Sequence, residues 1–214
     1  PLPPPFIFKP AAPKPAASSS DTSVERSSTA CRNDLAVRLL GAATNELTRL
    51  IESENPDVRQ IFNLLLGTLQ KALELNSCII FIKEKNGDRF HVGYGIGSLM
   101  SVARAVVLDP AEKNIFTLPV KRGEDVLIQN PDDEKMRSFV PEWLRQPGQV
   151  LPFFLLPIKD EKCSFALVCA TSTSSESFSL VSRFSAELRR IRTQLSKIGR
   201  LLTDNGPAVT QTNP

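Results

Sequence analysis

Two pairs of apolar segments, each joined by a short polar turn, constrain the fold more than any other feature of the sequence. The first pair is the near-continuous apolar run at Ser77 to Lys83 and the return segment at Arg89 to Tyr94, with Asn86 and Gly87 at the centre of the turn. The second pair is VLPFFLLPI (150–158) and CSFALVCA (163–170), joined by the polar turn KDEK. Short apolar runs bounded by turn residues are typical of buried strands, and Asn-Gly is a strong hairpin signal. The sequence therefore predicts two antiparallel hairpins.

Helical segments flank the predicted strands. Residues 33–51 carry apolar side chains at helical spacing, and a second helix is expected to begin at Pro56 and Asp57, residue types that suit a first turn. The apolar stripe of this second helix is wide, which indicates burial on two sides. A single long helix is expected from about Glu176 to Leu202. This mixture of elements predicts one α+β domain.

Composition divides the chain of 214 residues into three parts. Seven of the 17 prolines lie in the first 15 residues, and residues 18–29 are mostly Ser, Thr and charged. Such a segment buries too little apolar surface to offset its ordering entropy, so we predict a disordered Pro/Ser-rich linker at 1–30. The folded domain is expected at 31–202 and a disordered tail at 203–214. The linker contains one apolar stretch, Phe6-Ile7-Phe8, which is either a docking motif or an incidental patch.

Bulk properties exclude several classes of partner. The net charge of +3 is too small to indicate a nucleic-acid partner, and no apolar run approaches the roughly 18 residues that a membrane span needs. The cysteines form no CxxC pair, so we expect no metal and no cofactor. Cys78, Cys163 and Cys169 lie inside apolar runs and are expected to be reduced core residues, which favours a cytoplasmic location.

The sequence also offers little for catalysis. HVGYGIG has the spacing G-x-G-x-G, and it ends a hairpin strand instead of opening a helix, so Gly93, Gly95 and Gly97 are expected to be structural and not to bind phosphate. The single histidine, His91, alternates with apolar neighbours and is expected to be a solvent-facing strand residue. We therefore predict that the domain is not an enzyme.

Three segments resemble the GAF domain, a small-molecule and regulatory module: CIIFIKEKNGDRFHVGYGIG, VLDPAEKNIFTLPVKRGEDVLIQNP and VLPFFLLPIKDEKCSFALVCATS. The middle segment is similar to the variant found behind HDOD domains in bacterial signalling proteins, with counterparts at Asn114-Ile115-Phe116 and in a short strand at Val126-Leu127-Ile128. The resemblance implies a central antiparallel sheet with the N- and C-terminal helices on one face and the loop-rich segment on the other. It also implies a regulatory role coupled to an output domain absent from this chain.

The resemblance places a ligand cavity between the sheet and the central loops. Candidate pocket residues are four aromatic side chains and one possible anion contact: Tyr94, Phe116, Phe139, Trp143 and Arg104. Two readings stay open, because the aromatic side chains either line a pocket for an unidentified small molecule or fill the space themselves. With a filled pocket the domain would be a purely structural dimerisation module.

A heptad pattern in the last predicted helix indicates a partner. Apolar residues recur there at alternating spacings of three and four, and the later turns are expected to extend beyond what one small domain covers. We therefore predict a homodimer through the terminal helices, in a bundle that includes the acidic region of Glu46, Glu52 and Glu54. The candidate interface residues are Leu188, Ile191, Leu195, Ile198 and Leu202.

Overall fold

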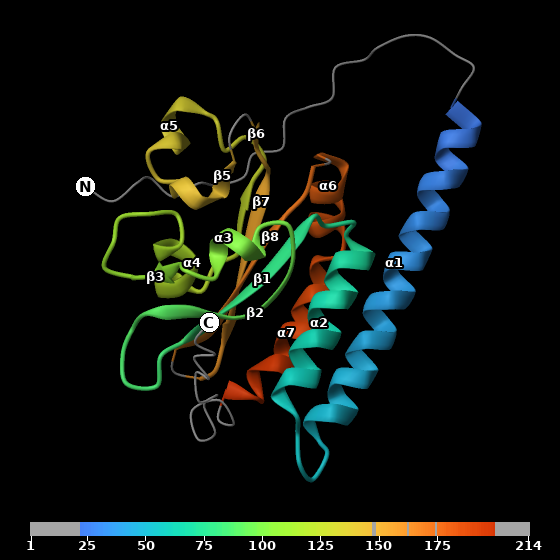
Figure 1. Cartoon of the computed structure of the whole chain (residues 1–214). Coiled ribbons are helices and arrows are strands. Elements are labelled where there is room, and N and C mark those ends of the chain that lie inside the picture. Colours follow the sequence, from blue (N-terminus) through green and yellow to red (C-terminus); the bar gives the residue numbers. More distant parts are fainter. Residues whose placement is uncertain (1–21, 147–148, 162, 174, 200–214) are drawn as a thin grey trace.

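A six-stranded antiparallel sheet forms the centre of the domain in the computed structural model (Figure 1), with the strand order β3-β2-β1-β8-β7-β4. The structure describes residues 22–146, 149–161, 163–173 and 175–199. The sheet strands are β1 (Ser77–Lys83), β2 (Phe90–Gly97), β3 (Val107–Leu108), β4 (Val126–Ile128), β7 (Phe153–Lys159) and β8 (Ser164–Thr171). Both predicted hairpins are present, as β1–β2 and β7–β8.

The two hairpins join through β1 and β8, which pair antiparallel from Ser77↔Thr171 to Ile82↔Ala166. Neighbouring side chains of β1 point to opposite faces, so Ile80 packs in one core cluster while Ile79 and Phe81 pack in the other. Strands buried on both faces need almost continuous apolar sequence, which explains the composition of these segments.

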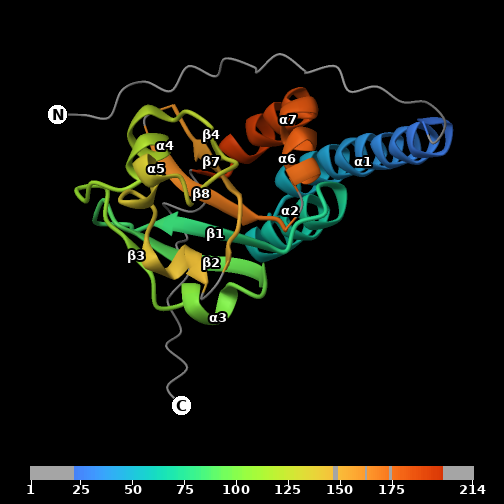
Figure 2. The same ribbon diagram turned by 90° about the horizontal axis from the view of Figure 1, so that it is seen from above.

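Four helices cover one face of the sheet (Figures 1 and 2): α1 (Thr22–Ile51), α2 (Val58–Ala72), α6 (Ser175–Arg183) and α7 (Ser185–Ser196). The helix α2 begins after Asp57, whose side chain accepts hydrogen bonds from the backbone N–H groups of Arg59 (2.8 Å) and Gln60 (3.3 Å). Asp57 therefore caps the helix instead of lying within its first turn. The wide apolar stripe of α2 is buried between the sheet and α1, as its width predicts.

The other face of the sheet carries the loop-rich middle segment (Figure 2), with a second core cluster beneath it. Its elements are short: α3 (Met100–Ala103), α4 (Thr117–Arg122), α5 (Glu134–Arg137), the 3-10 helix η1 (Glu142–Leu144), β5 (Arg145–Gln146) and β6 (Gln149–Val150). The predicted arrangement is therefore confirmed: an α+β fold with the terminal helices on one face and the irregular segment on the other.

The helix boundaries differ from the predictions at both ends of the chain. The first helix begins at Thr22 and not at Asn33, so residues 22–30, predicted as part of the linker, are helical. The predicted single C-terminal helix is two helices, because the backbone at Phe184 leaves helical geometry at φ −93° and ψ 22°. This break keeps Phe184 in the core at 3% exposure. Residues 1–21 and 200–214, including Leu202 and the predicted tail, lie outside the described residues.

No helix among the described residues is long and apolar enough to cross a membrane.

Candidate functional site

Three of the predicted pocket residues come together on the loop face of the sheet, and they pack against one another. The Phe116 and Trp143 rings are stacked, with centroids 5.6 Å apart, and both contact Phe81 on β1, at 6.1 and 5.8 Å. Phe139 joins the same apolar cluster, and its backbone carbonyl accepts a hydrogen bond from the N–H of Ile115 at 3.0 Å. Phe116 is only 2% exposed. These side chains fill the space over the centre of the sheet.

The other two predicted pocket residues lie elsewhere. Tyr94 is on the opposite, helix-covered face, where its ring is 5.1 Å from that of Phe62 on α2, and this burial is the main cause that raises its pKa. Arg104 is exposed at the end of α3. The structure therefore does not assemble the five residues into one pocket. The register decides this, because a bulge in the β1–β2 pairing leaves Gly93 between the partners of Ile80 and Phe81.

The glycines of β2 have structural roles, as the sequence predicts. Gly97 has a φ of +97°, and a Cβ there would lie 2.1 Å from the carbonyl oxygen of Asn76. A Cβ on Gly95 would lie 2.2 Å from the sulfur of Met100. Neither glycine opens a helix of useful length, since α3 has four residues. These positions need glycine for close packing and for backbone geometry.

A hollow of about 490 Å³ lies at the edge of the sheet, beside β4. Its apolar wall combines β4 with side chains of the middle segment, and its rim carries charged and amide groups. The lining includes Ile115, Leu118, Met136, Val126, Leu127 and Ile128 in the wall, and Arg122, Glu124, Asp125, Asp133 and Ser182 around them. We call this feature the β4 hollow. Sequence reasoning identified the strand 126–128 but missed the hollow, because Ile115, Leu118 and Met136 reach it only through the turns of the middle segment.

The charged groups around the β4 hollow differ in how firmly they are held. Arg192 on α7 pairs with Asp125 through both guanidinium nitrogens, one of them 3.1 Å from its carboxylate oxygen. Asp133 caps α5 by accepting a hydrogen bond from the N–H of Lys135 at 2.9 Å. Glu124 and the Arg122 guanidinium are exposed and have no partner among the described residues. The rim therefore offers two fixed carboxylates and two free charges of opposite sign.

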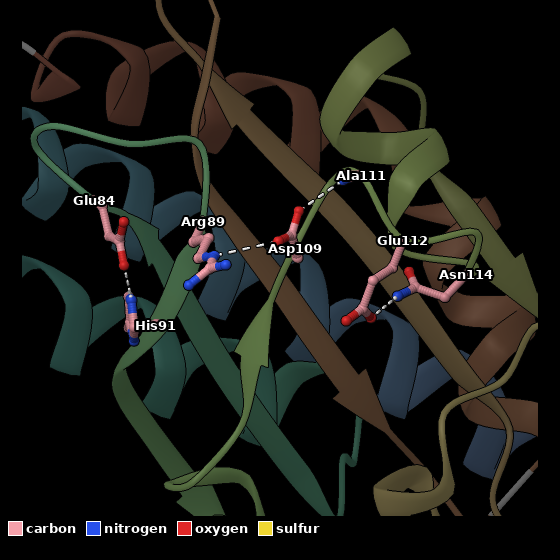
Figure 3. A network of polar contacts seen from close by, with 7 residues as sticks. All are labelled: Glu84, Arg89, His91, Asp109, Ala111, Glu112 and Asn114. Atoms are coloured by element: carbon pink, nitrogen blue, oxygen red, sulfur yellow. Dashed lines mark hydrogen bonds and ion pairs between the residues drawn. The ribbon is translucent and has the colours of Figure 1, made fainter.

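Two polar pairs lie near β2 and β3, at the opposite edge of the sheet, and a third lies in the loop that follows β3 (Figure 3). His91 Nε2 contacts Glu84, Arg89 reaches Asp109 at 3.2 Å, and Asn114 donates to Glu112 at 3.1 Å. The backbone N–H of Ala111 and the Arg89 guanidinium both lower the pKa of Asp109, the first more strongly. The His91 side chain is 45% exposed, as predicted for a strand residue facing solvent. The Arg89–Asp109 and Asn114–Glu112 contacts are exposed, and the His91–Glu84 contact is part-buried.

The cysteines are all free, and they are not gathered in one site. Cys78 and Cys169 are buried in the core, whereas Cys31 and Cys163 are exposed. The expectation that Cys163 is a core residue is wrong, because the turn ends there and β8 begins only at Ser164. Among the described residues, no group of three or more His, Cys, Asp or Glu side chains lies together as a metal site would require.

The predicted dimer residues on the last helix are buried inside one chain. Leu188, Ile191, Leu195 and Ile198 are 7%, 3%, 2% and 0% exposed and belong to the core beneath α1 and α2. The argument that these side chains need a second chain therefore fails, because α1 and α2 cover them. The basic helix does meet the acidic end of α1, since Lys197 lies 3.2 Å from Glu52 of the same chain.

Comparison with known proteins agrees with this architecture. No family model and no curated protein matches the sequence. Among solved structures, the GAF domain of an Acinetobacter phosphoenolpyruvate-protein phosphotransferase matches with a TM-score of 0.58 at 14% identity, covering 78% of this chain and 96% of that chain. The GAF domain of A. aeolicus nlh2, in an inactive state, matches with a TM-score of 0.58 at 15% identity, covering 78% and 98%. The chain has a GAF-like fold.

The same fold also occurs in an enzyme. The GAF-like domain matches free methionine-R-sulfoxide reductase from Neisseria meningitidis, solved with its substrate, at a TM-score of 0.59 and 11% identity, covering 88% of this chain and 95% of that chain. Between Gly95 and Gln149 the sequence has no cysteine. The fold alone therefore does not assign an activity, which depends on the side chains at each site.

Proposed function

We propose that this chain is a non-catalytic regulatory domain that binds a small molecule in the β4 hollow. The observation that carries the proposal is the hollow itself, which combines an apolar wall with a few polar groups at its rim. This composition is typical of small-molecule sites. The space over the centre of the sheet is filled by Phe116 and Trp143, so the binding function is assigned to the edge of the sheet.

The lining favours one chemical class of ligand. Ile115, Leu118 and Met136 would contact an apolar body of the molecule. At the rim, the unpaired Glu124 carboxylate favours a cationic or hydrogen-bond-donating group, and the nearby Arg122 tolerates a second, anionic group. An amphipathic molecule with an amine, such as an apolar amino acid or an amine metabolite, fits this pattern.

Contacts from the hollow to the terminal helices support a signalling role. Asp125, at the rim, pairs with Arg192 of α7, and α7 in turn pairs through Lys197 with Glu52 just after α1. A ligand that shifts the segment before β4 would therefore change a contact of the C-terminal helix. We propose that such a shift reaches an output domain through the terminal helices, in a cytoplasmic protein. The similarity of Asn114–Phe116 and Val126–Ile128 to the HDOD-associated variant supports an HDOD-containing protein.

A thermal-shift screen of apolar amino acids, amines and nucleotides tests the binding function. A true ligand should raise the melting temperature of the wild type, and it should lose this effect in Leu118→Trp, which fills the hollow. The matched control is Val107→Trp, because Val107 is 43% exposed on the opposite edge strand. A compound that stabilises wild type and Leu118→Trp equally would show that the β4 hollow is not its site.

The proposal that the domain is not an enzyme has a separate test. Among the described cysteines, the two exposed thiols, Cys31 and Cys163, are the ones that a substrate reaches without unfolding, and the single histidine, His91, contacts Glu84. Incubation with free methionine sulfoxide and a dithiol reductant should give no turnover above that of the double variant Cys31→Ser/Cys163→Ser. Turnover that these substitutions abolish would assign the domain to the reductase class.

A second candidate function, a dimerisation module, is favoured by the surface of α1. This helix has 30 residues, whereas its neighbour α2 has 15, and Figure 1 shows the first turns of α1 extending beyond the other helices. Leu35 and Val37, further along α1, are 58% and 43% exposed. Apolar side chains left in water on a protruding helix favour contact with a second copy.

The dimer proposal is tested by light scattering on wild type and on Leu35→Lys/Val37→Lys. The variant should be monomeric and the wild type dimeric. The control is Val102→Lys, since Val102 is 48% exposed but lies on α3. A wild type that is already monomeric across the accessible concentration range would exclude this candidate and leave the sensing proposal unaffected.

A further inference from the structure

The strand β4 ends the sheet, and its outer edge is open. Among the described residues, its backbone makes strand pairs only with β7, through Val126↔Leu155, Leu127↔Phe154 and Ile128↔Phe153. An open edge with apolar side chains is a template for pairing with another segment, and folded proteins normally cover such edges. The β4 hollow lies along this edge.

The side chains of β4 alternate between the two faces of the sheet. Val126 and Ile128 pack on the cluster of the loop face, and Leu127 packs on the cluster of the helix face. All three are half-buried. A strand added at this edge would place its first and third side chains on one face, beside Ile115, Leu118 and Met136, and its second side chain on the face of Leu127 and Ser182.

We propose that the segment Phe6-Ile7-Phe8 of this same chain binds the β4 edge as an added strand. Its apolar pattern matches the site, because Phe6 and Phe8 would lie on the loop side of the hollow, beside Ile115, Leu118 and Met136, and Ile7 would face Leu127. Main-chain hydrogen bonds supply affinity in this mode of recognition, and alternate side chains supply specificity. Residues 1–21 lie outside the described part of the chain, so the segment is identified by its sequence.

The prolines around the segment agree with a short added strand. Pro5 precedes Phe6, and Pro10 follows two residues after Phe8. Proline has no backbone N–H, so it cannot donate to a ladder and it limits the pairing to the residues between. The strand β4 has three residues, and the apolar stretch also has three.

The reach and the charge of the segment also fit. Residues 9–21 connect the segment to α1 at Thr22, and these 13 residues span at most about 43–47 Å when extended. This reach is as long as the whole of α1, whose 30 residues measure about 45 Å. Figure 1 shows α6, which supplies Ser182 to the hollow, toward the same end of the molecule as the first turns of α1.

Charge complementarity favours this occupant. Of the three carboxylates in the lining, Asp125 is paired with Arg192 and Asp133 caps α5, so Glu124 is the free carboxylate beside the guanidinium of Arg122. Just after the apolar stretch, the segment carries Lys9 and then Lys14, and its only acidic residue is Asp21. The free Glu124 carboxylate is a suitable partner for the Lys9 ammonium. This inference rests on the proposed function: a ligand that binds the β4 hollow would displace Phe6-Ile7-Phe8 from the sheet edge. The residues that precede α1 would then no longer be held against the domain.

Amide hydrogen exchange on the full chain tests the docking. The double substitution Phe6→Ser/Phe8→Ser removes the two anchors without touching the folded domain. We expect the outward-facing amides of β4 to exchange about tenfold faster in this variant than in wild type. Leu2→Ser is the control, since Leu2 lies outside Phe6-Ile7-Phe8, and it should leave the exchange rates of the β4 amides unchanged. The amides of β3, on the opposite edge, should be the same in all three proteins.

Three outcomes separate the alternatives. Slow exchange at β4 in wild type, lost in Phe6→Ser/Phe8→Ser and independent of protein concentration, supports docking within one chain. Protection that appears only as the concentration rises means that a second copy covers the edge, which overturns the proposal. Identical exchange at β4 in wild type and in the variant also overturns it. The thermal-shift screen repeated on Phe6→Ser/Phe8→Ser separates failure of the docking proposal from failure of the proposed function. A ligand that stabilises this variant but not Leu118→Trp would support small-molecule binding in the β4 hollow even if Phe6-Ile7-Phe8 does not dock there.

Discussion

Arg192 and Asp125, 67 residues apart in the sequence, form a two-point ion pair that joins α7 to the segment just before β4. The Arg192 side chain is 24% exposed and that of Asp125 is 49% exposed. The pair is therefore partly solvated, and its contribution to stability is smaller than that of a buried pair. It is nevertheless the contact through which the rim of the β4 hollow touches the C-terminal helix.

We expect a double-mutant cycle with Asp125→Asn and Arg192→Gln to give a coupling free energy of about 0.5–1 kcal/mol at low salt, falling as salt is added. The measurement is urea denaturation of the four proteins. The reference is the exposed pair Arg49–Glu46 within α1, which should couple more weakly than Arg192 and Asp125. A coupling of zero at low salt would show that Arg192 and Asp125 do not interact in solution.

Two glycine-to-alanine substitutions should have opposite effects on stability. Gly97→Ala should destabilise the domain by more than about 1 kcal/mol, because its φ is +97° and the new Cβ would meet backbone atoms of Asn76 and Ser77. Gly41→Ala should stabilise it by about 0.5–1 kcal/mol, since Gly41 lies inside α1 with nothing within 4 Å of the new Cβ. Denaturant midpoints measure both. Equal destabilisation by the two changes would contradict the assigned geometry of β2.

Thiol labelling of the native protein should separate the four cysteines into two that react quickly and two that do not react. Cys31 and Cys163 are exposed and should react quickly with an aromatic disulfide reagent in native protein, whereas Cys78 and Cys169 should react only on unfolding. Mass spectrometry of the peptides identifies which thiols react. Fast labelling of Cys78 or Cys169 without denaturant would mean that the central strands are not buried as described.

The buried thiols also make stability depend on pH. Burial raises the pKa of Cys78 from 9.0 to about 12, and burial with the neighbouring Cys78 raises the pKa of Cys169 as well. In the unfolded chain these thiols lose their protons near pH 9, while in the native protein they keep them. The native state therefore binds more protons above pH 9, and stability falls as the pH rises through that window, by at most about 1.4 kcal/mol per pH unit for each thiol.

A matched pair of variants tests this pH dependence. Cys78→Ala and Cys169→Ala should each reduce the slope of the unfolding free energy against pH above pH 9 by the contribution of one thiol. Other titrating groups contribute equally to both variants. A slope that is identical in wild type and in Cys78→Ala would contradict the burial of that thiol.

Local features of the fold were predictable because their causes are adjacent in the sequence. The turn at Asn86 and Gly87 joins two apolar runs, so the β1–β2 hairpin follows from turn chemistry. The strand at Val126–Ile128 was also predicted, from its resemblance to known domains. By contrast, the exposure of Cys163 depends on where β8 begins, and a shift of one residue at a strand end reverses that result.

The candidate site was much less predictable. The aromatic residues Phe116, Phe139 and Trp143 were correctly expected to lie together, but Tyr94 was assigned to the wrong face. A strand places alternate residues on opposite faces, and the bulge at Gly93 shifts that alternation by one position. The β4 hollow was missed because its wall takes residues from β4, α4, α5 and the loop before α4, whose proximity depends on the path of the irregular middle segment.

The sequence by itself determined that this chain folds as an α+β domain around two hairpins, because apolar periodicity and turn residues act over a few neighbours. Only the tertiary structure decided what the apolar stripe of α7 contacts. The heptad of Leu188, Ile191 and Leu195 fits a second chain as well as it fits its own core, since the hydrophobic effect is non-directional and does not specify which surface covers a side chain. The packing of α1 and α2 over α7 makes that choice, and it leaves the open edge of β4 as the surface still to be covered.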